Sequence, residues 1–128
     1  MKPLTLEWVD KAEGDFVTAQ RELRARKSPN YDAACFHAQQ CAEKYLKARL
    51  QEVGTAFSKT HDLANLLALV LPAEPAWAVM KADLDILTAF AVDVRYPGVS
   101  ATKAEARDAV AICRDAREKV RVSLGLAP

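Results

Sequence analysis

The chain has 128 residues, of which 51% are hydrophobic and 27% are charged, and its formal net charge is +1. These proportions are typical of one soluble globular domain over residues 1–128, which can bury a core without disulfides or a structural metal. The near-zero charge argues against a dedicated nucleic-acid coat, because such proteins carry an excess of Lys and Arg to neutralise phosphates. No apolar run approaches the roughly 20 residues that span a bilayer, so we expect a cytoplasmic protein without membrane contact.

Short segments with Gly and Pro divide the chain, which has four glycines and six prolines. Between these segments Val, Ile and Thr nowhere alternate with polar residues as strands require, so the composition predicts helices only. The predicted helices cover residues 5–26, 31–53, 61–71, 75–94 and 102–123.

Apolar residues form a seam along the first, second, fourth and fifth helices, at alternating steps of three and four. In the first helix the seam is Val9, Ala12, Phe16, Ala19 and Leu23, and in the second it is Ala34, Ala38, Cys41, Tyr45 and Ala48. Such seams pack long helices nearly antiparallel, at about 20°. We therefore predict an all-α fold, an up-and-down antiparallel bundle of four long helices plus one short helix.

The helix over 31–53 carries a second ridge opposite its main seam, at about 100° per residue. The ridge consists of Phe36, Gln40, Glu43, Lys47 and Leu50. Phe36 and Leu50 are either ordinary exposed hydrophobic residues or are buried against a second copy of the same helix. In a two-fold dimer Glu43 of one chain can pair with Lys47 of the other. The ridge is therefore a candidate dimer interface.

The same helix places His37 and Lys44 within about 20° of each other. An imidazole near an ammonium can serve as an acid or base beside an anion, although a bond from His37 to another helix is the alternative. Further along, Thr60 is the expected N-cap of the short helix. His61 follows it at the helix N-terminus, where the dipole favours a neutral imidazole and free amides can hold a phosphate.

The most concentrated polar feature follows the fourth helix, at Asp93, Arg95 and Tyr96. Pro97 ends the helix and favours extended geometry for Tyr96. Arg95 can grip a phosphate while Tyr96 stacks on a base, so these three residues and Lys44 are candidate nucleotide-binding residues. The alternative is a simple helix end, stabilised by a cation near the C-terminal dipole.

The three cysteines, Cys35, Cys41 and Cys113, form no CxxC pair. On a helix Cys35 and Cys41 point in different directions, which forbids a local disulfide, and the two histidines do not complete a zinc-binding spacing. We expect free, buried cysteines, no metal and no cofactor.

Three strings of residues resemble one family. They are residues 31–48, which read YDAACFHAQQCAEKYLKA, residues 59–63 (KTHDL) and residues 95–97 (RYP). Their order and spacing resemble those of the HEPN domain proteins, in their small stand-alone prokaryotic form, over essentially the whole chain. The resemblance implies a helical bundle that forms a homodimer. It also implies a partner, a minimal nucleotidyltransferase, with which such proteins form a toxin–antitoxin pair.

Many HEPN proteins are metal-independent ribonucleases, in which an Arg, followed after four to six residues by a His, meets its twin across the dimer. The resemblance makes Arg95 the catalytic candidate, but residues 96–102 contain no histidine, so the base has to be His37 or His61. In some relatives the partner modifies a tyrosine close to this motif, and Tyr96 is the corresponding candidate here.

Three hypotheses follow. The favoured one is a homodimeric module that interacts with nucleotide or RNA and pairs with a minimal nucleotidyltransferase. The second is a divergent metal-independent ribonuclease, and the third is a structural adaptor without a ligand site.

Overall fold

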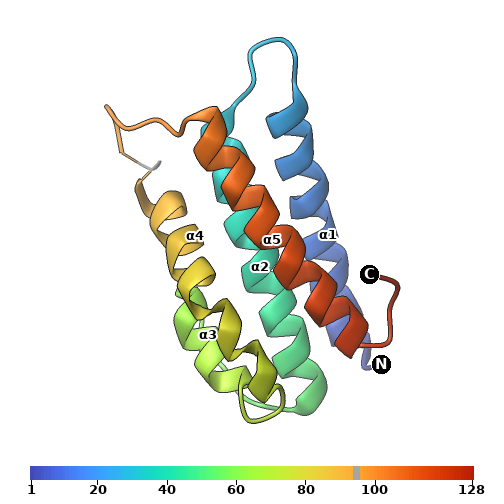
Figure 1. The fold of residues 1–128 in the computed structure, drawn as a ribbon. Helices are drawn as coiled ribbons and strands as arrows, with labels where there is room; N and C mark the ends of the chain where they lie inside the picture. The colour runs from blue at the N-terminus through green and yellow to red at the C-terminus, as the bar shows by residue number, and fades with distance from the viewer. Residues whose placement is uncertain (94–95) are drawn as a thin grey trace.

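The computed structural model describes residues 1–93 and 96–128, and most of this length is helical (Figure 1). In chain order the helices are α1 Pro3–Arg24, α2 Tyr31–Val53, α3 Leu63–Val70, the 3-10 helix η1 Pro75–Met80, α4 Lys81–Asp93 and α5 Lys103–Ser123. No strand occurs in these two ranges. The predicted all-α bundle is confirmed: its long helices run up and down beside one another, and both termini lie at the lower end in Figure 1.

The helix α2 is the centre of the bundle, because it packs against α1, α3, α4 and α5. The seams predicted for the first two helices are buried along their length, except for Leu23, which is half-buried. Alanines without exposed surface, such as Ala12 and Ala38, let the helix axes approach closely. Larger side chains, such as Tyr45 and Leu46, fill the space beside them.

The first and fifth predicted helices begin within two residues of the predicted positions, at Pro3 and Lys103, whereas the starts of the third and fourth differ in kind. The segment predicted as one helix over 75–94 begins as the 3-10 helix η1, a geometry that is frequent at helix N-termini. Thr60 does not cap the short helix α3: Asp62 does, since its side chain accepts a hydrogen bond from the Ala64 amide at 3.0 Å. The Thr60 hydroxyl instead accepts from the Asp62 amide at 3.1 Å. His61 therefore precedes the cap and lies outside the first turn of α3.

A polar network around Glu13 links α1 to α2 and α5. The Glu13 carboxylate accepts hydrogen bonds from the hydroxyl of Tyr45 and from Arg117 Nε, the latter at 2.5 Å. Arg121 donates to the same Tyr45 hydroxyl at 3.1 Å. Burial raises the pKa of the Glu13 carboxyl, but the hydrogen bonds from Arg117 and Tyr45 outweigh it, so the pKa is lowered overall. Burial, reinforced by Glu13, raises the pKa of Tyr45, which therefore stays a hydroxyl donor.

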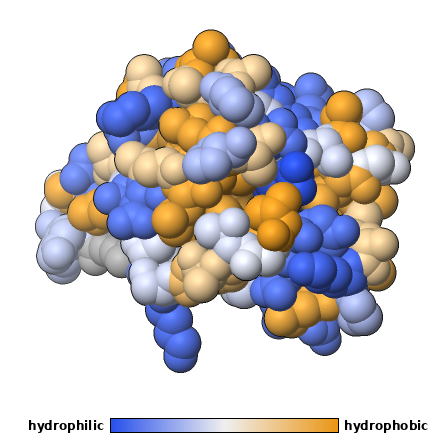
Figure 2. Space-filling model, turned by 90° about the horizontal axis from the view of Figure 1, so that it is seen from below, coloured by the Kyte–Doolittle hydropathy of each residue, from blue (hydrophilic) through white to orange (hydrophobic). Residues whose placement is uncertain are grey.

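The lower end of the bundle mixes hydrophobic and hydrophilic residues, as the view from below shows (Figure 2). Exposed hydrophobic residues on the elements that meet there include Val53, Val79 and Val122. Among the helices of the described residues, none combines the length and the apolar character that a membrane crossing needs.

Candidate functional site

The ridge predicted as an open face of α2 is largely buried inside the single chain. Leu50 has no exposed surface, Glu43 is 3% exposed and Lys47 is 5% exposed, so their expected exposure is wrong. Two neighbours lie against the ridge: the Trp8 ring of α1, whose centroid is 5.6 Å from Lys47 Nζ, and the segment between α2 and α3, whose His61 pairs with Glu43. Phe57 of that segment meets the Trp8 ring edge to face, at a centroid distance of 6.0 Å. Of the five ridge residues, Phe36 and Gln40 remain half-exposed.

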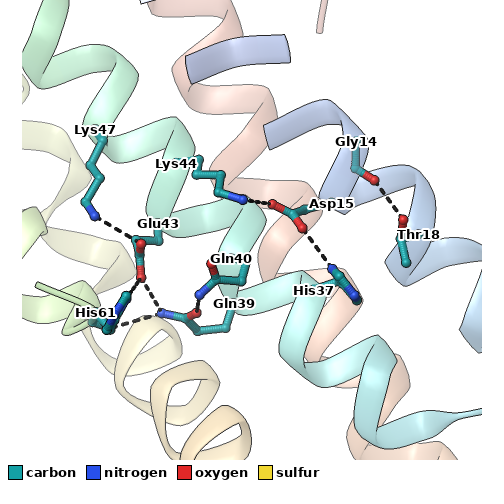
Figure 3. A network of polar contacts seen from close by, with 10 residues as sticks. All are labelled: Gly14, Asp15, Thr18, His37, Gln39, Gln40, Glu43, Lys44, Lys47 and His61. Atoms are coloured by element: carbon teal, nitrogen blue, oxygen red, sulfur yellow. Dashed lines mark hydrogen bonds and ion pairs between the residues drawn. The ribbon is translucent and has the colours of Figure 1, made fainter. Parts of the chain in front are cut away.

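Glu43 is the hub of a polar network on this face (Figure 3). Lys47 Nζ donates to its Oε2 at 3.0 Å, and this ion pair lies within one helix turn of a single chain rather than across a dimer. Its Oε1 accepts from Gln39 Nε2 at 3.2 Å and lies 2.9 Å from His61 Nδ1. Because the Glu43 carboxylate and the Lys47 ammonium are both nearly excluded from water, each charged group depends on the other for the stabilisation that water would give.

His61 is held at two points and still faces solvent. Its backbone carbonyl accepts from Gln39 Nε2 at 2.9 Å, and its ring nitrogen Nδ1 is paired with Glu43. Its side chain is 65% exposed. When the imidazole is neutral, donation from Nδ1 to a carboxylate fixes the tautomer and leaves Nε2 as a free acceptor. This geometry suits a general base or a hydrogen-bond acceptor for a ligand.

A cavity of about 270 Å³ adjoins this histidine. It is lined by residues of α2, of the segment that precedes α3 and of α4: Gln39, His61, Asp62, Thr88, Ala91 and Val92. Within the described ranges the buried Thr88 hydroxyl has no hydrogen-bond partner. A buried polar group of this kind costs free energy unless a ligand or water satisfies it. The cavity thus has an oriented imidazole at its edge and, in its wall, a threonine whose hydroxyl is buried and unsatisfied.

His37 and Lys44 meet a different group, the carboxylate of Asp15 on α1. His37 Nδ1 lies 2.8 Å from one of its oxygens, and Lys44 Nζ lies 2.5 Å from the other (Figure 3). Asp15 is 8% exposed. The alternative reading of His37, a bond to another helix, is therefore confirmed. Lys44 already has an anion, which weakens its case as a nucleotide-binding residue.

The comparisons with known proteins decide the family. The family model of the HEPN domain matches residues 5–123, nearly the whole chain. The chain belongs to the HEPN family. A search of curated proteins finds no match.

Two crystal structures resemble this HEPN chain. One is TT1696 from Thermus thermophilus, with 24% identity, a TM-score of 0.77, and coverage of 92% of this chain and 96% of that one. At this identity it supports the fold alone. The other is ST0689, an archaeal HEPN homologue, with 26% identity, a TM-score of 0.74, and coverage of 97% and 99%.

The remaining predicted site residues of the HEPN chain are Asp93, Arg95 and Tyr96. Arg95 lies outside the described residues, as does its neighbour at position 94. Asp93 is the last residue of α4 and is exposed, and the Tyr96 amide donates to its carbonyl at 3.4 Å. Tyr96 is 64% exposed, so its ring is accessible to a ligand or a modifying enzyme.

The cysteines of the HEPN chain are free and buried, as predicted. Burial raises the pKa of Cys35 to about 11 and holds that of Cys41 well above its usual range, so both are protonated, unreactive thiols at neutral pH. Within the residues that the structure covers, no three His, Cys, Asp or Glu side chains gather as metal ligands.

Sequence reasoning missed Gln39, Asp15 and Thr88. Gln39 belongs to the string typical of the family, and Thr88 follows the buried Leu84 by four residues, so the helical period was the available signal. Asp15 directly precedes the seam residue Phe16 in α1. A carboxylate so close to a buried seam is costly unless it is paired, so a cationic partner on a neighbouring helix is expected.

Proposed function

We propose that this HEPN protein is a homodimeric module that binds a nucleotide or RNA and pairs with a minimal nucleotidyltransferase in a toxin–antitoxin system. The observation that carries the proposal is the Glu43-oriented His61 at the edge of a cavity that is also lined by Thr88, whose buried hydroxyl has no partner among the described residues. Nucleotides offer the hydroxyl, phosphate and base-edge groups that such donors and acceptors bind.

The homodimer in this proposal rests on the family resemblance and on the surface near the cavity. Phe36 and Gln40 of α2 are half-exposed, and Val92 and Tyr96 at the end of α4 are exposed. A dimer that joins these surfaces would bury apolar area and enclose the cavity mouth.

Light scattering after size exclusion tests the assembly. We expect a mass of about twice the 14.1 kDa of one chain. Phe36→Glu should shift the protein toward the monomer, since it places a charge in the interface, whereas Val17→Glu on the exposed face of α1 should not. We also expect the neighbouring reading frame to encode a minimal nucleotidyltransferase and a tagged chain to retain that enzyme. A 14.1 kDa monomer that retains no such enzyme contradicts the proposal.

A second candidate function, metal-independent RNA cleavage, is favoured by the same histidine. His61 Nε2 is the ring nitrogen that would accept the proton of a ribose 2′-hydroxyl as its oxygen attacks the adjacent phosphorus. The bond from phosphorus to the 5′-oxygen of the next nucleotide breaks, and that oxygen leaves with a proton from water. His37 is less suited to this role, because its side chain is only 30% exposed and is bound to the buried Asp15. Arg95 would stabilise the charge that develops on the phosphate.

A further inference from the structure

In Figure 1, α1 ends and α5 begins at the upper end of the bundle. Residues from these two helix ends line a basic cavity. Its volume is about 550 Å³. Arg24 and Arg26 line it from the end of α1 and the residues that follow, Lys103 and Arg107 from the first two turns of α5, and Tyr31 from the start of α2. The other lining residues are uncharged, so the wall of the cavity carries four positive charges and no negative one.

These four cations lack the ion pairs and side-chain hydrogen bonds that most other described cations of the protein have. Within residues 1–93 and 96–128 none of the four takes part in an ion pair or a side-chain hydrogen bond. Three acids near these cations in sequence are otherwise engaged: Glu22 accepts from the Asn30 amide at 3.2 Å, Asp32 from the Ala101 amide at 2.6 Å and Glu105 from the Thr102 amide at 2.9 Å. Asp108, which follows Arg107 in the chain, does not line the cavity. With a net charge of only +1 for the whole chain, this concentration of positive charge is local.

Two of the cations stand where the helix itself disfavours them. Lys103 is the first residue of α5 and Arg107 follows four residues later, so they are like charges on neighbouring turns at the positive end of the helix dipole. Arg24, at the C-terminal end of α1, is placed favourably by comparison. The one carboxylate in the first turn, Glu105, is bound in the capping box with Thr102 and, in the part of the chain that the structure describes, forms no ion pair with either cation. Residues that break a local rule without a compensating contact are typical of functional sites.

We propose that this cavity binds the phosphate groups of single-stranded RNA. The inference rests on the proposed function and adds to it a second contact surface, separate from the residues around His61. Three of the four cations are arginines, whose planar guanidinium groups match phosphate oxygens in pairs. Tyr31 supplies an aromatic surface beside them, on which a base can stack. The competing ligand is an acidic protein surface. Its carboxylates would bind the four cations but, unlike an RNA base, would not stack on the aromatic ring.

The test is fluorescence anisotropy with a labelled 12-nucleotide uridine RNA, in EDTA, over a series of salt concentrations. The variant Arg24→Gln/Arg107→Gln removes two cations from the cavity. The matched control Lys11→Gln/Lys81→Gln removes the same charge from exposed positions outside it. We expect the cavity variant to bind at least about tenfold more weakly and its salt slope to fall by about 1.4, or about 0.7 for each lost phosphate contact. The control should stay within about twofold of the wild type.

The outcomes separate this inference from the proposed function. If the wild type binds RNA and the cavity variant matches the control, the cavity assignment is overturned while RNA binding stands. If the wild type binds no RNA, the inference fails together with the RNA-binding part of the proposed function, while nucleotide binding and the pairing with a nucleotidyltransferase stand. If the cavity variant loses binding to a labelled polyglutamate peptide but keeps its RNA affinity, the cavity recognises an acidic protein and the inference is wrong. Unchanged circular dichroism of both variants shows that the fold is intact.

Discussion

Glu43→Leu is expected to lower the free energy of unfolding by about 3 kcal/mol. The substitution leaves the Lys47 ammonium without its ion-pair partner at a position that is 5% exposed. It also removes the acceptor of Gln39 and the partner of His61 Nδ1. A buried charge that loses its partner costs far more than an exposed one, for which the loss is about 0–1 kcal/mol. Urea unfolding followed by circular dichroism measures the change.

The double variant Glu43→Leu/Lys47→Met should recover most of this loss, because no unpaired charge then remains. The matched control is Asp85→Leu, which breaks a pair of the same spacing, Lys81–Asp85, whose side chains are 67% and 48% exposed. It should change stability by less than about 1 kcal/mol. A Glu43→Leu variant as stable as the Asp85→Leu control would show that the ridge is an open face after all.

His61→Gln is expected to reduce metal-independent RNA cleavage by about 10²- to 10⁴-fold, the usual contribution of a general base. The matched variant His37→Gln should retain cleavage within a few-fold, because His37 serves the Asp15 contact between α1 and α2. The rate is measured with a labelled RNA in the presence of EDTA. Equal loss in both variants, or none in His61→Gln, contradicts the role of His61 as the base. A wild-type chain that cleaves no RNA removes the second candidate function.

The bundle was predictable because its determinants are local. Steps of three and four place residues such as Ala34, Ala38 and Cys41 on one face, and this face has to find an apolar partner. Gly and Pro mark the helix boundaries for equally local reasons. The start of α3 was the exception. Two good capping residues, Thr60 and Asp62, stand two positions apart, and a single sequence does not choose between them.

The candidate site was only partly predictable, because it depends on contacts between distant segments. Helical phase correctly places Phe36, Glu43 and Lys47 on one ridge, but it does not reveal that residues 54–62 fold back over that ridge. His61 reaches Glu43 from 18 residues away, and Asp15 reaches His37 from 22 residues away. Both pairs exist only after α1, α2 and the following segment have packed.

The two histidines offer the most direct test of the central proposal, that the residues around His61 bind nucleotide or RNA. The chain contains no other histidine, so their ring nitrogens can be followed separately by NMR in ¹⁵N-labelled protein. On saturation with the 12-nucleotide uridine RNA, we expect the Nε2 signal of His61 to shift. The signals of His37, which is bound to Asp15, should stay in place. An unchanged His61 signal at saturating RNA, or a shift confined to His37, would contradict the proposal.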